Sequence, residues 1–197
     1  MSSLLDQLIK AFCCLPGVGP RSAQRMVFNL LENNRGGGEI LGATLLQAMA
    51  NIKNCQQCRT FTEDEVCHLC KNPGRDSSTL CIVESPADIL AIEQSGSFKG
   101  RYFVLMGHLS PIDGVGPEDL GIDVLLNHVA LGGIREIIIA TNPTVEGEAT
   151  SYYLSEAVKP YHVIISRIAH GVPLGGELEF VDSHTLSHAF SGRIVLE

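Results

Sequence analysis

Several absences in this sequence exclude familiar classes of protein. No apolar run approaches the roughly 18–20 residues that a membrane-spanning helix needs. There is no Gly-Lys dipeptide and therefore no P-loop, which argues against an ATPase. The seven cysteines are an odd number, which fits a reducing compartment better than a disulfide framework. Residues 1–12 also lack the pattern of a signal peptide, so we expect a cytoplasmic protein without a membrane partner.

What the chain does have is a globular composition with an uneven charge. Hydrophobic residues make up 45% of its 197 residues and charged residues 18%, which is typical of a folded protein. Residues 1–79 carry 8 Lys/Arg against 7 Asp/Glu, a net charge of +1, whereas residues 80–197 carry 6 against 15, a net charge of −9. The first part can therefore face a polyanion, while the second would repel one or recruit basic partners.

The pattern of apolar residues changes along the chain. Apolar residues recur at helical spacing over 4–12, 21–34 and 40–54, and the glycine-rich stretch 34–39 is predicted to be a loop. After a linker at 71–78, helical stretches at 86–95, 117–133 and 147–158 separate four short, β-rich apolar runs: 79–85, 101–107, 135–141 and 161–168. Strands that alternate with helices predict a parallel sheet with helices on its faces.

The predicted fold class is therefore a multi-part α/β protein. We expect a helical domain over 1–54, a small cysteine-rich motif over 55–78, and a parallel-sheet α/β domain over 79–168. The last segment, 169–197, is predicted to hold a Gly/Pro-rich loop and a short helix, too small to fold alone. Exchange of the chain ends between subunits would cover that segment and the amphipathic first helix, so we expect an oligomer.

Four cysteines form the strongest local motif. Cys55, Cys58, Cys67 and Cys70 are two CxxC pairs separated by eight residues, a spacing that lets four thiolates converge on one tetrahedral zinc ion. The alternative, a redox pair, usually has a single CxxC. Because no ligand position is left open for water, the sequence predicts one structural zinc per chain. The remaining cysteines lie in apolar surroundings and are expected in the core: Cys13, Cys14 and Cys81.

The stretch "LPGVGPRSAQRMVFNLL" predicts a helix end, a tight glycine turn and a new helix. Glycines allow close approach of a ligand, and a helix N-terminus is a natural phosphate site. Arg21 and Arg25, four residues apart, share one face of that helix. The stretch is similar to a helix-hairpin-helix, which binds DNA without sequence specificity. The alternative is an ordinary packing corner between two helices.

Acidic residues follow two of the predicted strands. Glu84 ends the first strand, and "TNPTVEGEAT" places Glu146 and Glu148 after another. These stretches resemble the Toprim domain, which carries a Glu after its first strand and an Asp-x-Asp later. Here Asn142 and Thr144 stand at the two Asp positions, and neutral residues suit magnesium poorly. We therefore expect a Toprim scaffold without catalysis, with an acidic rim for docking. The glutamates could equally stabilise a helix N-terminus.

The order of these parts resembles the RecR family of recombination mediators over essentially the whole chain, including "GVPLGGELEFVD". The resemblance implies a non-enzymatic clamp for DNA repair and recombination after DNA damage: a ring-like homotetramer with swapped ends that works with RecO and RecF. It would help load RecA on gapped DNA. The resemblance also implies DNA contacts at Arg21 and Arg25, and partner binding by Glu84, Glu146 and Glu148.

One position departs from that resemblance, and two rival functions stay open. His170 stands where an arginine is expected, so a positive role there is in doubt, because histidine is mostly neutral at pH 7. A small Toprim nuclease or primase-like enzyme would use Glu84, Glu146 and Glu148 with magnesium. A zinc-stabilised interaction protein would need no DNA-binding arginines.

Overall fold

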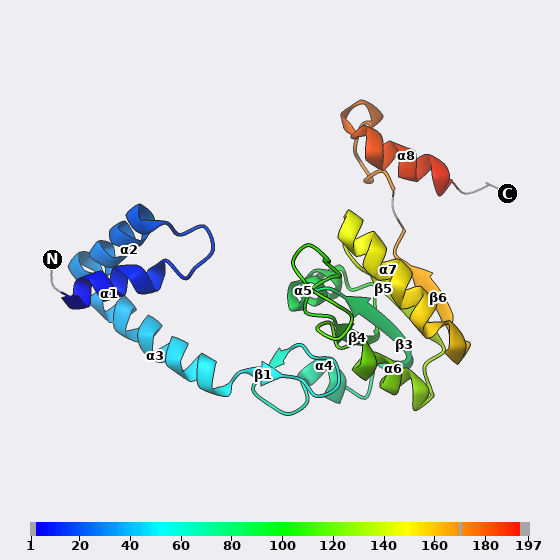
Figure 1. Ribbon diagram of the computed structural model, residues 1–197, viewed down its shortest axis with the longest axis horizontal. Coiled ribbons are helices and arrows are strands. Elements are labelled where there is room, and N and C mark those ends of the chain that lie inside the picture. The colour runs from blue at the N-terminus through cyan, green and yellow to red at the C-terminus, as the bar shows by residue number, and fades with distance from the viewer. Residues whose placement is uncertain (1–2, 170, 194–197) are drawn as a thin grey trace. The chain divides into compact units, whose positions relative to one another are not determined.

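The computed structural model describes residues 3–169 and 171–193, and the chain divides into two compact units between Ile52 and Lys53. The positions of the chain's parts relative to one another are not determined, so each unit is described by itself (Figure 1). His170, whose expected basic role was in doubt, lies outside the described residues. In the described ranges no helix combines the length and the hydropathy needed to cross a bilayer.

The first unit contains three helices: α1 (Ser3–Phe12), α2 (Pro20–Asn33) and α3 (Arg35–Asn51). The predicted helices over 4–12 and 21–34 are confirmed. Ala23 and Val27, one turn apart on α2, are fully buried and form the centre of the unit. Gly17, with a φ of +76°, makes the turn between α1 and α2, a conformation that favours glycine.

The predicted loop over residues 34–39 is wrong, because α3 already begins at Arg35 and includes three consecutive glycines. Asn34 explains the difference: its side chain accepts a hydrogen bond from the Gly37 N–H at 3.0 Å and so caps the helix. A Cβ on Gly37 would overlap the Asn34 side chain, so the cap requires glycine there. The cap offsets part of the low helix propensity of the three glycines.

Two cysteines expected in the core are exposed instead. Cys13 and Cys14 follow α1 in the turn toward α2 and face the surface, whereas Cys81 is buried as expected. Burial raises the pKa of the Cys81 thiol to about 12. The apolar surroundings of Cys13 and Cys14 in the sequence therefore belong to a turn and not to a buried helix face.

The second unit begins with a small two-stranded sheet and continues into a four-stranded one. Strands β1 (Lys53–Asn54) and β2 (Phe61–Thr62) pair antiparallel, and α4 (His68–Lys71) follows. The larger sheet has the order β4-β3-β5-β6 and all its pairs are parallel, as predicted. Its strands are β3 (Asp76–Val83), β4 (Gly100–Val104), β5 (Glu136–Ala140) and β6 (Ile164–Arg167).

Alternate residues of the central strands serve two different cores, one on each face of the sheet. Leu80 and Ile82 of β3 pack against α6 (Ile122–Ala130) and α7 (Val145–Val158) on one face. Cys81 and Val83 face α5 (Pro86–Ser95) and the four cysteines on the other. Because successive side chains of a strand point to opposite faces, one run of apolar residues supplies both cores. The sheet is therefore the middle one of three layers.

The predicted linker over 71–78 contains an anchor and the start of a strand. Arg75, with a side chain 9% exposed, donates two hydrogen bonds to Glu93 of α5, at 2.9 and 2.7 Å, and its guanidinium lies over the Tyr102 ring. Hydrogen bonding from Arg75 lowers the pKa of Glu93. This bidentate ion pair connects α5 to the residue directly before β3, which begins at Asp76.

The chain ends in short elements. A 3-10 turn η1 (Lys159–Tyr161) follows α7, and a second, η2 (Leu178–Phe180), precedes α8 (Ser183–Ser191). Asp182 caps α8 by accepting hydrogen bonds from the His184 and Thr185 N–H groups. The predicted short helix in the last segment is therefore present.

Candidate functional site

The four cysteines of the CxxC pairs converge on one point. Cys55 follows β1, Cys67 is the N-cap of α4 and Cys70 lies within α4. All four thiols are buried and their sulfur atoms lie within 4.8 Å of one another. A tetrahedral ion about 2.3 Å from each sulfur requires sulfurs about 3.8 Å apart. The observed cluster, with 3.5 Å between the Cys58 and Cys67 sulfurs, fits one zinc ion.

The charge of these thiols explains why a cation suits the site. Contact with the Cys70 thiol and burial raise the pKa of Cys58, and burial raises the pKa of Cys67 to about 11. Burial also opposes ionisation of Cys55, but backbone N–H groups lower its pKa to about 7. A divalent cation would supply the charge that allows buried thiols to ionise together.

The cysteine cluster is also part of the core of the large sheet. It packs with Cys81, Tyr102 and Val104 from β3 and β4 in one buried cluster. The Cys58 carbonyl accepts a hydrogen bond from the Val104 N–H at 2.9 Å, where the edge strand β4 ends. The cysteine motif therefore covers one face and one edge of the sheet, and its integrity affects the whole unit.

The start of α2 has the chemistry of an anion site. Its N-cap is Gly19, which has no side chain to cap the helix, and Pro20 occupies the first turn. A Cβ on Gly19 would meet no atom within 4 Å, so the backbone here is open to a ligand. Arg21 and Arg25 are both exposed on the same helix, and its first turn contains no acidic residue. Free N–H groups, the helix dipole and two cations attract phosphate at this point.

At the carboxyl end of the parallel strands, Glu84 is held internally. It is 6% exposed, and its two oxygens accept hydrogen bonds from Asn142: from the backbone N–H at 2.8 Å and from Nδ2 at 2.6 Å. Asn142 thus satisfies the carboxylate of Glu84 with N–H donors, where the Toprim pattern has a second carboxylate. The Glu84 side chain is 8% exposed.

Gly147 allows this tight arrangement. A Cβ at Gly147 would overlap the Asn142 carbonyl oxygen and lie 2.9 Å from a Glu84 oxygen. Its N–H donates to the Thr144 hydroxyl, which caps α7, and its carbonyl accepts from the Thr141 hydroxyl. Thr144, the second position where the Toprim pattern has Asp, therefore serves as a helix cap.

The two later glutamates differ in their surroundings. Glu146 is exposed in the first turn of α7, whereas Glu148 is partly buried and forms a bidentate ion pair with Arg167 at 2.5 and 2.6 Å. Both carboxylates lie near the positive end of the helix dipole, where they stabilise the start of α7.

Two neighbours of this edge were missed by the sequence reasoning. Arg167 ends β6, and its position at the carboxyl end of a parallel strand was the signal that could have identified it. His108 carries no such signal: it lies in a long loop, and its Nδ1 is 3.7 Å from a Glu84 oxygen. The sequence alone does not indicate which residue of that loop lies beside the edge of the sheet.

Comparison with protein families agrees with this arrangement. Residues 78–169 match the Toprim domain, which gives the class of the parallel-sheet part. Three further matches are to RecR models: the helix-hairpin-helix over residues 5–49, the four-cysteine zinc finger domain over 52–72 and the C-terminal model over 171–194. The chain belongs to the RecR family.

The family and the geometry together establish three coarser points. The zinc finger match and the buried four-cysteine cluster fit one structural zinc per chain. The helix-hairpin-helix match supports DNA binding, and the set of RecR domains supports a role in recombinational DNA repair. The mixed helical and parallel-sheet fold expected from the sequence is confirmed.

The cysteine cluster yields a direct prediction. Cys58→Ser combined with Cys67→Ser is expected to abolish zinc in the purified protein and to lower the thermal midpoint, because metal binding and folding of the shared core are coupled. The matched control is Cys81→Ser, which changes a buried thiol of the same cluster outside the CxxC pairs. Elemental analysis should find about one zinc per chain in the control. Equal zinc in the double variant and the wild type would contradict the assignment.

A second prediction concerns the hydrogen-bonded pair of Glu84 and Asn142. Asn142→Asp places a carboxylate against Glu84 and should destabilise the protein by about 2–3 kcal/mol, because a donor to a charged acceptor is replaced by a like charge. Millimolar magnesium or manganese should restore part of that stability and leave the wild type unchanged. Asn142→Ala, which removes the donor without adding charge, is the control. Thermal unfolding that responds equally to the cations in both variants would refute this explanation.

Proposed function

We propose that this chain is a non-enzymatic DNA clamp of recombinational repair, which acts with RecO and RecF to help load RecA on gapped DNA. Double-stranded and gapped DNA are its nucleic-acid partners, bound without sequence specificity. The observation that carries this proposal is the exposed arginine pair beside an uncapped helix start in a helix-hairpin-helix. RecA loading with RecO and RecF is the finer step, and family membership supports it.

In this proposal the first unit holds DNA through its phosphates. Arg21 and Arg25 contribute charge, and the open backbone at Gly19 allows close approach of the DNA. Residues 1–52 carry 4 Lys/Arg against 3 Asp/Glu, a net charge of +1, so the field around one unit is weak. Few phosphate contacts per subunit give weak, salt-sensitive binding, which becomes useful when several subunits engage one DNA.

The second unit is proposed to hold the partner proteins. Residues 53–197 carry 10 Lys/Arg against 19 Asp/Glu, a net charge of −9, which favours a basic partner. Glu146 is the exposed carboxylate at the start of α7, and Glu148 lies two residues further, beside Arg167. Because Glu84 is buried, its proposed part in partner binding is indirect: it holds the segment around Asn142 that leads into α7.

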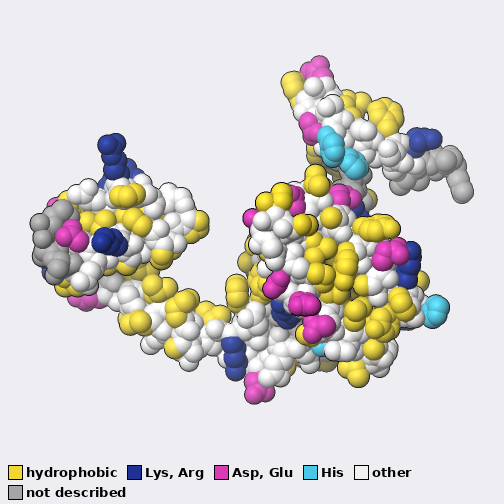
Figure 2. Space-filling view, in the orientation of Figure 1, with side chains coloured by type: hydrophobic (Ala, Val, Ile, Leu, Met, Phe, Trp, Pro, Cys, Tyr) yellow, Lys and Arg dark blue, Asp and Glu magenta, His cyan; other side chains and the backbone are white. Residues whose placement is uncertain are grey.

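Assembly into a ring-like homotetramer is proposed from uncovered apolar surface. An apolar groove of about 500 Å³ runs between the three helices of the first unit, with Leu8, Leu31 and Leu45 among its lining residues. Figure 2 shows hydrophobic side chains at the surface along α3, where Leu46 is 76% and Met49 72% exposed. Apolar surface of this extent on a small unit favours contact with further chains.

We base the proposed absence of enzymatic activity on the hydrogen bonds that Glu84 accepts from Asn142. A magnesium-dependent nuclease or primase needs carboxylates free to bind the cation. Here Glu84 is engaged by Asn142, and Thr144 caps α7, so the residues at the two Asp positions both serve the scaffold.

The division of labour predicts opposite effects for two pairs of substitutions. Arg21→Ala with Arg25→Ala should weaken DNA binding at least about tenfold and reduce its salt slope by about two per engaged subunit. Glu146→Ala with Glu148→Ala should weaken capture of RecO and leave DNA affinity unchanged or slightly higher, because it removes charges that repel phosphate. Fluorescence anisotropy with labelled DNA and with labelled RecO, at fixed ionic strength, measures both.

Two controls make the outcome clear. Glu146→Ala alone separates the exposed carboxylate from the Glu148–Arg167 ion pair, whose loss could disturb the fold. Zinc content and oligomer size should be unchanged in every variant. If both double variants lose DNA and RecO binding to the same extent, the two-surface proposal is wrong.

A further inference from the structure

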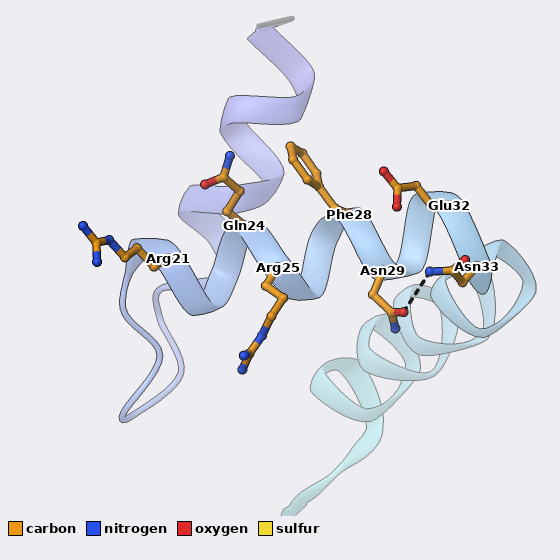
Figure 3. A pocket seen from close by; sticks show the side chains of 7 residues that line it. All are labelled: Arg21, Gln24, Arg25, Phe28, Asn29, Glu32 and Asn33. Carbon is orange, nitrogen blue, oxygen red and sulfur yellow. Dashed lines mark hydrogen bonds between the residues drawn. The ribbon is translucent and has the colours of Figure 1, made fainter.

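The exposed face of α2 extends beyond its two arginines. An open, shallow depression of about 410 Å³ is lined by side chains of α2 alone (Figure 3). Towards the C-terminal end of the helix the lining changes from guanidinium groups to side-chain amides, with Asn29 and Asn33 following Arg25. If only the arginines contact DNA, the two side-chain amides beside Glu32 have no role in binding.

The two asparagines form a hydrogen-bonded pair. Asn33 Nδ2 donates a hydrogen bond to Asn29 Oδ1 at 3.1 Å, drawn as the dashed line in Figure 3. This bond sets the orientation of the Asn29 amide, with its oxygen toward Asn33 and its Nδ2 group away from it. Throughout the described part of the chain, no protein acceptor takes the Nδ2 hydrogens of Asn29, which is exposed. Two hydrogen-bond donors are thus held ready for a ligand.

These donors continue the line of the arginines. Arg21, Arg25 and Asn29 follow one another at intervals of four residues, which is about 6 Å along a helix axis for each step. Figure 3 shows Arg25 and Asn29 projecting to the same side of α2. Side-chain amides commonly donate to phosphate and sugar oxygens, as arginines do. A DNA backbone that passes Arg25 therefore reaches the Asn29 amide next.

A neighbouring row of side chains on α2 is less suited to DNA. Gln24, Phe28 and Glu32 line the same depression but point away from Arg25 and Asn29 in Figure 3. Glu32 in this row carries a negative charge, which repels phosphate. The favourable path beyond Arg25 lies on the Asn29 side.

We propose that Asn29, oriented by Asn33, is a further and uncharged contact to the phosphodiester backbone of DNA on α2. This inference rests on the proposed DNA-binding function and deepens it. The arginines attract the DNA through charge, and the asparagine fixes its register along the helix through directional hydrogen bonds.

The experiment compares affinity with salt dependence. Asn29→Ala in the full-length oligomer should weaken binding to a gapped duplex about three- to tenfold, as expected for the loss of neutral hydrogen bonds. Its plot of log affinity against log salt should keep the wild-type slope, because an amide releases no counterion. Arg25→Ala should lower both the affinity and the slope. Asn33→Ala, which frees the Asn29 amide to rotate, should give a smaller loss than Asn29→Ala.

Gln24→Ala is the matched control, since it removes an amide from the same helix whose side chain points away from Arg25 and Asn29 in Figure 3. It should bind DNA like the wild type, and all variants should keep the wild-type thermal midpoint and oligomer size. If Asn29→Ala binds like the wild type, or if Gln24→Ala loses as much affinity, the Asn29 contact is overturned. If Arg21→Ala with Arg25→Ala leaves DNA binding intact, the proposed DNA-binding function itself fails, so the two failures are distinguishable.

Discussion

Burial of four thiols against one face of the parallel sheet is the constraint on which the second unit depends. The cysteines share a core with β3 and β4, and the Cys58 carbonyl receives a hydrogen bond from Val104 at the edge of the sheet. Burial opposes the ionisation of these thiols, and a bound cation would allow them to ionise together and hold the four cysteines in place. Zinc therefore stabilises the sheet as well as the small motif that binds it.

The sheet in turn presents a modified Toprim edge. Glu84 follows β3, as the Toprim pattern requires, but Asn142 offers it two N–H donors in place of a shared cation. Gly147 makes room for that contact, and Thr144 caps the helix that carries Glu146. The same few residues thus form a hydrogen-bonded segment that leads to the exposed carboxylate of Glu146.

Local patterns predicted much of this molecule, and tertiary contacts decided the rest. The parallel strands and the CxxC spacing were readable because a period of two and paired cysteines are local signals. The loop predicted at residues 34–39 failed because the Asn34 cap depends on a contact that a glycine count does not reveal. Burial of Glu84 could not be foreseen either, because its partner Asn142 is 58 residues away in the chain.

The proposal that the chain acts as a clamp has a direct test in DNA topology. The oligomer is assembled on gapped circular DNA and on the same DNA in linear form, and is then challenged with high salt, which removes the attraction of Arg21 and Arg25 for phosphate. Gel filtration of the two mixtures measures how much protein stays bound. A clamp that encircles DNA should stay on the circle and leave once the circle is cut. Equal loss from circular and linear DNA would contradict a ring around the DNA.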